Sequence, residues 1–216
     1  MLLDLPTLVT RHGMKVSGVV HAGAHLAEEA AQYQRLFAGR PVWWIEANPD
    51  VVSKIQTALA PYPAQQLIQA LLWDRDGQML DFHVTNYDGM SSSILHFGTH
   101  PEFSPDTKFT HQIQLRSRTI DTLVDEFGIS GCNFLNMDLQ GVELQCLRGA
   151  ERLVTEQIDY INSEVNTEDV YRGCTKLHEL DAHLAERGFT RVATEIVPGQ
   201  GWGDALWVRT TPREPR

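Results

Sequence analysis

The stretch that most constrains the fold is residues 18–29, where an apolar segment runs into a glycine and then into residues with helical spacing. Apolar side chains recur on one helical face at Leu26, Ala30, Tyr33 and Phe37. We therefore expect a buried strand that ends near Ala22, a tight turn at Gly23, and a helix that begins within the stretch. Glycine lets the backbone close on a ligand, and in α/β sheets this turn is where a cofactor binds.

A second apolar strand follows at Trp43–Ile45 and ends in an acid, Glu46. Glu46 lies about twenty residues beyond Gly23, which is the distance at which such folds hold ribose hydroxyls. Asn48, with Pro49 directly behind it, predicts the N-cap of the next helix. The two strand ends together indicate a cofactor that contains a nucleoside.

The rest of the chain alternates strands and helices, which predicts an α/β fold with one mostly parallel sheet, helices on both faces and a C-terminal antiparallel hairpin. We expect Leu67–Trp73 to be an internal parallel strand, residues 142–153 to be one helix, and a strand at 158–161 to end before Glu164. Ligands of such sheets bind at the carboxyl ends of the strands. Five residues should therefore share one edge: Gly23, Glu46, Leu72, Asp138 and Glu164.

Length and composition suit one domain over residues 1–216, since 216 residues of which 42% are hydrophobic can bury a substantial core. Residues 1–17 are expected to form an N-terminal helical extension. Residues 86–110 contain the longest irregular stretch, and a loop of that length is usually a binding loop. We expect this segment to contact the substrate.

The formal net charge is −10, and there is no run of Lys or Arg. This disfavours nucleic acid and anionic membranes as partners and favours a small molecule or a neutral carbohydrate. No apolar run approaches the length of a membrane span. Three widely spaced cysteines indicate a reducing compartment, so we expect a soluble, unprocessed cytoplasmic protein, which could form a homodimer.

The cofactor is constrained by what surrounds Gly23. A dinucleotide fingerprint needs glycines two and five positions later, but His25 and Glu28 stand there. Glu28 and Glu29 would also repel a phosphate brought to the start of the helix. S-adenosylmethionine carries adenosine without phosphates, so methyl transfer is favoured over hydride transfer. An NAD-dependent oxidoreductase is the alternative.

The chain also resembles the FkbM-type S-adenosylmethionine-dependent methyltransferases. The resemblance rests on residues 20–25, 46–49, 91–93, 118–123, 136–143 and 147–150. It implies a class I methyltransferase-like Rossmann fold and O-methylation of a hydroxyl of a sugar, glycan or natural product. By position it implies that Ala70 and Leu71 flank adenine, that Asp138 faces the methyl group, and that the remaining cofactor contacts are Gly23, His25, Glu46, Ala47 and Asn48.

The chain departs from this family at two positions. His21 stands where an acid is usual, and Ala27 replaces a usual glycine. An acid there would help to position the ammonium group of the cofactor, whereas neutral imidazole accepts one hydrogen bond. These departures motivate a second alternative, a noncatalytic member that binds the cofactor or a partner.

Methyl transfer to a hydroxyl needs alignment and a base. Asp138 is the first choice for the base, although it could instead cap a helix that begins at Gln140 or Gly141. Glu164 is a second acid, or half of a divalent metal pair with Asp138; no metal site is assigned. His96 is a further choice for a base or a substrate contact.

Two other residues have weaker assignments. Glu143 is explained by its place in the first turn of a helix, where its charge complements the helix dipole. Trp202, among glycines, could stack on a sugar ring.

Overall fold

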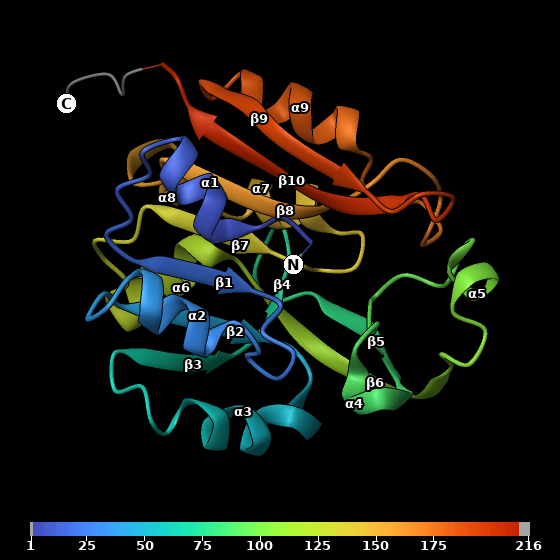
Figure 1. Ribbon diagram of the computed structural model, residues 1–216. Coiled ribbons are helices and arrows are strands. Elements are labelled where there is room, and N and C mark those ends of the chain that lie inside the picture. The colour runs from blue at the N-terminus through green and yellow to red at the C-terminus, as the bar shows by residue number, and fades with distance from the viewer. Residues whose placement is uncertain (1, 212–216) are drawn as a thin grey trace.

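The computed structural model describes residues 2–211 and is built on a twisted seven-stranded sheet (Figure 1). The strand order is β3-β2-β1-β7-β8-β10-β9. The first five strands in this order are mutually parallel, and β10 is antiparallel to both of its neighbours, β8 and β9. The bounds are β1 Val19–Ala22, β2 Val42–Glu46, β3 Gln65–Gln69, β7 Phe134–Met137, β8 Tyr160–Asn166, β9 Phe189–Ile196 and β10 Trp202–Arg209. The predicted parallel sheet and C-terminal hairpin are therefore confirmed.

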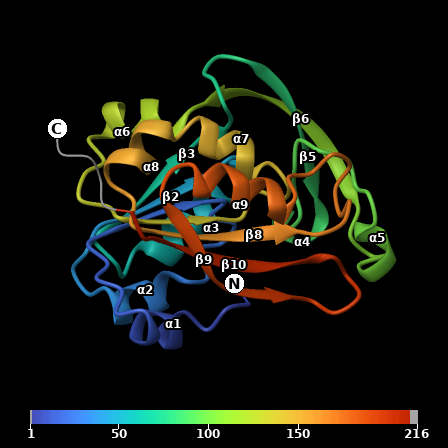
Figure 2. The same cartoon turned by 90° about the horizontal axis from the view of Figure 1, so that it is seen from above.

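Helices cover both faces of this sheet, as the view from above shows (Figure 2). On one face a buried cluster joins α1, α2 and α3 through Leu5, Tyr33 and Ile55. On the other face a larger cluster joins four helices, α6 to α9. The bounds are α1 Leu5–Arg11, α2 Ala30–Leu36, η1 Pro49–Val51, α3 Val52–Leu59, α6 Ile120–Phe127, α7 Glu143–Arg148, α8 Glu151–Glu156 and α9 Leu177–Ala185.

A second sheet of three strands stands beside the carboxyl ends of the main strands (Figure 1). Its order is β4-β6-β5, and the long segment that joins β5 to β6 carries two single-turn helices. The bounds are β4 Leu71–Leu72, β5 Met79–Thr85, α4 Asn86–Gly89, α5 His100–Phe103 and β6 Phe109–Arg118. The segment at 86–110 is thus held over the end of the main sheet.

Leu67–Trp73 does not form the single internal strand that its apolar residues suggest. The run breaks at Ala70 into β3, which is an edge strand of the main sheet, and β4, which belongs to the second sheet. The run is apolar because Leu71 packs under the second sheet against Phe82 and Val84.

Three other boundaries differ from the prediction. The helix after Gly23 begins only at Ala30. The helix expected at 142–153 is two helices, α7 and α8, because Gly149 lies against the backbone of Trp73 where a side chain would not fit. Strand β8 extends to Asn166, so Glu164 lies within it.

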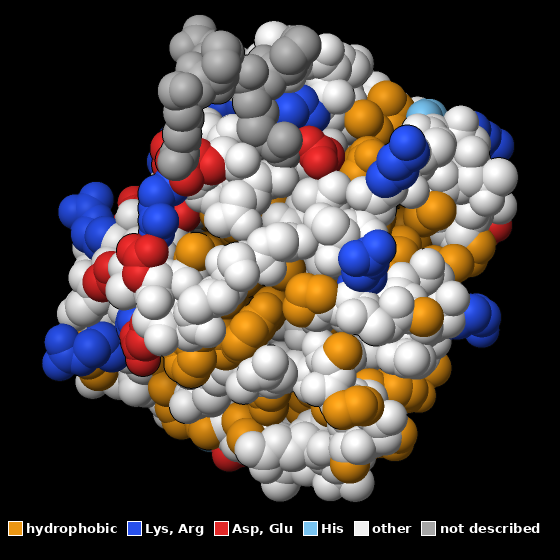
Figure 3. All heavy atoms as spheres, turned by 90° about the vertical axis from the view of Figure 1, so that its left-hand side faces the viewer, with side chains coloured by type: hydrophobic (Ala, Val, Ile, Leu, Met, Phe, Trp, Pro, Cys, Tyr) orange, Lys and Arg blue, Asp and Glu red, His pale blue; other side chains and the backbone are white. Residues whose placement is uncertain are grey.

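Positively and negatively charged side chains are interspersed on the surface. On the face that Figure 3 presents, lysine and arginine side chains stand singly or beside aspartate and glutamate. Over residues 2–211, none of the helices is both long enough and apolar enough to cross a bilayer.

Candidate active site

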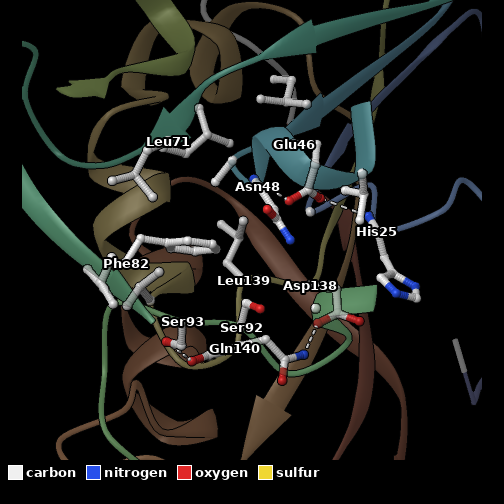
Figure 4. A pocket seen from close by; sticks show the side chains of 18 of the residues that line it. His25, Glu46, Asn48, Leu71, Phe82, Ser92, Ser93, Asp138, Leu139 and Gln140 are labelled. Carbon is white, nitrogen blue, oxygen red and sulfur yellow. Dashed lines mark hydrogen bonds between the residues drawn. The ribbon is translucent and has the colours of Figure 1, made fainter. Parts of the chain in front are cut away.

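Two cavities meet at the carboxyl ends of the strands. Cavity A lies between the main sheet and the second sheet and includes about 670 Å³ of space, part of it open to solvent (Figure 4). Its wall contains all eight residues that the sequence assigns to the cofactor: Gly23, His25, Glu46, Ala47, Asn48, Ala70, Leu71 and Asp138. Cavity B, with about 990 Å³ of such space, adjoins it and shares Met90, Asp138 and Gln140 with it.

Gly23 closes the inner end of cavity A. Its φ of +87° is in the left-handed region that favours glycine. A Cβ atom at this position would overlap the carbonyl oxygen of Asp138. The amide nitrogen of Gly23 donates to the carbonyl oxygen of Ile45 at 2.9 Å. The turn therefore draws the ends of β1, β2 and β7 together, as the glycine at this position predicts.

Glu46 organises the turn on the other side of cavity A. Its Oε2 accepts a hydrogen bond from the amide of His25 at 2.8 Å, and its Oε1 accepts one from the amide of Asn48 at 2.7 Å. Burial raises the pKa of Glu46, and the two amide donors oppose that effect. A carboxylate offers about four acceptor positions, so acceptor positions are left for the two hydroxyls of a ribose.

The rest of cavity A suits a nucleoside without phosphates. Leu71, Phe82 and Leu139 give it an apolar wall against which a planar base can pack. Its charged lining residues are the acids Glu46, Asp88 and Asp138, and its lining includes no lysine or arginine. The donor and acceptor set therefore fits adenosine joined to a cationic group, and it offers no lysine or arginine to a pyrophosphate.

His25 follows the turn at Gly23 and lines cavity A. Its Nδ1 lies 2.6 Å from Oε1 of Glu28. Burial lowers the pKa of His25, but the hydrogen bond and charge of Glu28 outweigh it, so the pKa is raised overall. Glu28 thus serves as the partner of His25.

The two departures from the family pattern lie outside cavity A. His21 is buried and stacks on Trp44 with 4.4 Å between ring centroids, and Nδ2 of Asn136 lies 3.0 Å from its Nε2. Burial lowers the pKa of His21, which keeps it neutral. Ala27 is also buried and has a φ of +57°, where glycine is the relaxed residue.

A hydrogen-bonded network crosses the boundary between the two cavities. Nε2 of Gln140 donates to Oδ1 of Asp138 and, at 2.7 Å, to Oε2 of Glu164. The hydroxyl of Tyr171 donates to Oε1 of Gln140. Burial and the nearby charge of Asp138 raise the pKa of Glu164 well above its ordinary value. The structure thus brings together the two acids that the sequence singled out.

Glu143 holds the loop that carries Asp138 through hydrogen bonds to its backbone. Oε1 of Glu143 accepts hydrogen bonds from the amides of Leu139 and Gly141, both at 3.1 Å. These bonds support Gln140 in the left-handed region, at a φ of +55°. Glu143 lies in the first turn of α7, as the sequence predicts, and it is fully buried. The helix α7 begins at Glu143 with Val142 as its N-cap, so the alternative of Asp138 as a helix cap is wrong.

His96 lies away from both cavities. It is an exposed side chain that packs beside His83, with 4.3 Å between ring centroids, and beside Phe109. His100, on the same segment, lines cavity B instead. In residues 2–211, no group of three or more His, Cys, Asp or Glu side chains could hold a metal ion.

Sequence reasoning missed several residues of the site. Gln140 lies within one of the motifs of the family resemblance, but its hydrogen bond to Glu164 joins the loop after β7 to strand β8. Tyr171 and Asp204 carry no local signal. Each reaches cavity B only through the tertiary fold.

The comparisons with known proteins identify the family of the chain. The sequence profile of the family described as "Methyltransferase FkbM domain" matches residues 21–191. The chain belongs to this family. Its membership confirms the predicted family and the predicted cofactor, S-adenosylmethionine.

A curated relative is the 2-O-methyltransferase NoeI of Sinorhizobium fredii, which is 23% identical over 161 residues. That match covers 72% of this chain and 65% of the relative, less than two thirds of its length.

Solved structures support the fold alone. A S-adenosylmethionine-dependent methyltransferase from Aquifex aeolicus has a TM-score of 0.53 at 12% identity and covers 97% of this chain and 91% of its own. Fibrillarin from Aeropyrum pernix, solved with S-adenosylmethionine, has a TM-score of 0.53 at 10% identity and covers 89% of this chain and 66% of its own.

Proposed function

We propose that this FkbM-family protein is an O-methyltransferase that transfers a methyl group from S-adenosylmethionine to a hydroxyl of a sugar, glycan or natural product. The observation that carries the proposal is that Asp138 and Gln140 line both cavities. One compound in cavity A and another in cavity B would therefore both contact the same carboxylate. The activity of the curated relative supports an oxygen atom as the acceptor.

In this proposal cavity A holds the cofactor, which supplies an activated methyl group on a sulfonium. Glu46 accepts hydrogen bonds from the ribose, while Ala70 and Leu71 pack against adenine. The turn at Gly23 leaves room for the amino-acid part. His25, Ala47 and Asn48 complete the wall beside the ribose.

Cavity B holds the acceptor, and Asp138 is the proposed base. A sugar hydroxyl is too weak an acid to ionise at neutral pH, so a carboxylate must accept its proton during attack. Glu164 has a strongly raised pKa because it is buried beside Asp138, which favours its protonated form. We therefore assign proton acceptance to Asp138 and assign hydrogen bonding of the acceptor to Glu164, with Gln140 holding the two side chains in place.

The segment at 86–110 is the proposed substrate loop. It contributes Met90, Ser91, His100, Phe103 and Ser104 to the wall of cavity B. His96 faces neither cavity and has no role in the proposed mechanism. A single domain, a cytoplasmic location and a homodimer stay predictions.

The test is the substitution Asp138→Asn, with Asp106→Asn as its matched control. Asp106 is an exposed acid on the substrate loop outside both cavities. The rate of transfer of labelled methyl groups to a panel of sugars should fall about 10²- to 10⁴-fold in Asp138→Asn and stay unchanged in the control. Calorimetry with S-adenosylhomocysteine should show that both variants still bind the cofactor product. Unchanged turnover in Asp138→Asn would remove it from this role.

The same calorimetry separates the alternatives. Heat on addition of NAD would favour the oxidoreductase. Binding of S-adenosylmethionine without turnover on any acceptor would favour the noncatalytic member. The structure weakens the motive for that member, because His21 and Ala27 are not among the residues that line cavity A.

A further inference from the structure

One wall of cavity B carries two buried carboxylates side by side. Glu164 on β8 and Asp204 on β10 are direct partners in the antiparallel register. Their exposed fractions are 7% and 5%. Burial and the charge of Asp138 raise the pKa of both acids, so this wall disfavours a further negative charge and favours a hydrogen-bond donor or a cation.

None of the residues that line cavity B is a lysine or an arginine. Asp204 accepts hydrogen bonds from the backbone amides of Leu2 and Leu3. His100 is the one imidazole in the lining, and burial lowers its pKa, which keeps it neutral. An anion that entered this cavity would lie beside Asp138 and Asp204 and would meet no lysine or arginine in the lining.

His100 is a buried polar residue of this lining. Only 6% of this residue is exposed, and it lines cavity B. Its Nε2 lies 3.2 Å from Oγ of Ser91, but its Nδ1 has no hydrogen-bond partner among residues 2–211. A buried polar atom without a partner costs free energy.

Two aromatic side chains complete the character of the cavity. Trp202 and Phe103 line it and are partly buried. Nε1 of Trp202 donates to Oε1 of Gln200 at 2.9 Å, which fixes the indole ring. A fixed aromatic ring can pack against the apolar face of a sugar, and it attracts a cation.

We infer that cavity B selects its acceptor by charge. It takes hydroxylated compounds whose polar groups donate hydrogen bonds to Glu164 and Asp204, most strongly one with a protonated amine, and it rejects compounds with a carboxylate, sulfate or phosphate. This inference rests on the proposed function, because it names the class of acceptor for the same site.

The test uses three probes that share one ring and differ in charge: glucosamine, glucose and glucuronate. Binding is measured by calorimetry and by thermal shift on protein saturated with S-adenosylhomocysteine. Glucosamine should bind best, and glucuronate should bind at least about tenfold more weakly than glucose, because a like charge across an interface costs several kcal/mol and each 1.4 kcal/mol is about tenfold. Equal binding of the three probes, including no binding by any of them, would overturn the inference.

Two variants and one control locate the effect. Asp204→Asn and Glu164→Gln keep the shape of the side chain. Asp204→Asn should reduce the preference for glucosamine over glucuronate several-fold, and Glu164→Gln, which replaces a protonated acid, should reduce it less. Glu102→Gln removes an exposed acid from the same loop outside the cavity and should leave the preference unchanged. A preference that persists in both cavity variants would also overturn the inference. Failure of the proposed function is distinguishable, because it would appear as no binding of S-adenosylhomocysteine or no methyl transfer to any acceptor.

Discussion

Replacing Glu143 with glutamine should change how the free energy of unfolding depends on pH. Glu143 is fully buried, and burial raises its pKa from the ordinary 4.5 to about 7. Its Oε1 accepts hydrogen bonds from the amides of Leu139 and Gly141, while its Oε2 has no hydrogen-bond partner among residues 2–211. Glutamine keeps the accepting oxygen and the shape of the side chain but cannot ionise.

The sign follows from the proton bound in each state. Below about pH 4.5 Glu143 is protonated in both the folded and the unfolded chain. As the pH rises from about 4.5 to about 7, the unfolded chain loses this proton while the folded protein keeps it, so stability falls. The interval between 4.5 and about 7, at about 1.4 kcal/mol per pKa unit, corresponds to about 3 kcal/mol. Above about pH 7 this contribution is constant.

The measurement is urea unfolding of the wild type and Glu143→Gln, followed by tryptophan fluorescence between about pH 5 and about pH 8. The stability of the variant minus that of the wild type should rise by up to about 3 kcal/mol across this range. Other titrating groups largely cancel in that difference, and Glu102→Gln controls for the loss of one exposed negative charge. A difference that stays flat, or that falls with pH, would refute the assignment of a buried, proton-retaining Glu143.

The remaining predictions concern the turn, the network and the ribose contact. Gly23→Ala should destabilise the protein by more than about 1 kcal/mol and abolish cofactor binding, because the new methyl group overlaps the backbone of Asp138. Urea unfolding would measure the stability and calorimetry the binding, and a urea midpoint equal to that of the wild type would contradict the prediction. Tyr171→Phe should lower kcat several-fold with cofactor affinity unchanged, since it removes the hydrogen bond that the hydroxyl donates to the side-chain amide of Gln140. A kcat equal to that of the wild type in initial-rate kinetics would exclude a role of Tyr171 in positioning Gln140. Glu46→Gln should weaken binding of S-adenosylhomocysteine by about 10-fold or more, because an ionised acceptor is replaced by a neutral one; an unchanged Kd by calorimetry would place the ribose elsewhere.

Much of cavity A could be predicted from local sequence. A glycine after an apolar run, an acid at the next strand end and an asparagine before proline each have one common structural meaning, and the structure places Gly23, Glu46 and Asn48 accordingly. The helix boundaries were less predictable. Apolar spacing does not show where a close backbone contact, such as that of Gly149 with Trp73, ends a helix.

The acceptor side could not be predicted in the same way. Gln140 meets Tyr171 and Glu164 across three different segments, and Glu164 meets Asp204 only through the register of β8 with β10. Apolar periodicity identifies a strand but not its partner, so the position of β3 at the sheet edge was equally hidden.

What the sequence determined by itself is the fold class and the turns that form cavity A, because both depend on residues that are close in the chain and on backbone geometry that few residue types adopt. The tertiary structure alone decided which acids share a cavity, which of them is buried, and which histidine reaches it. Those properties depend on burial and on pairing between distant segments, which exist only after the chain has folded.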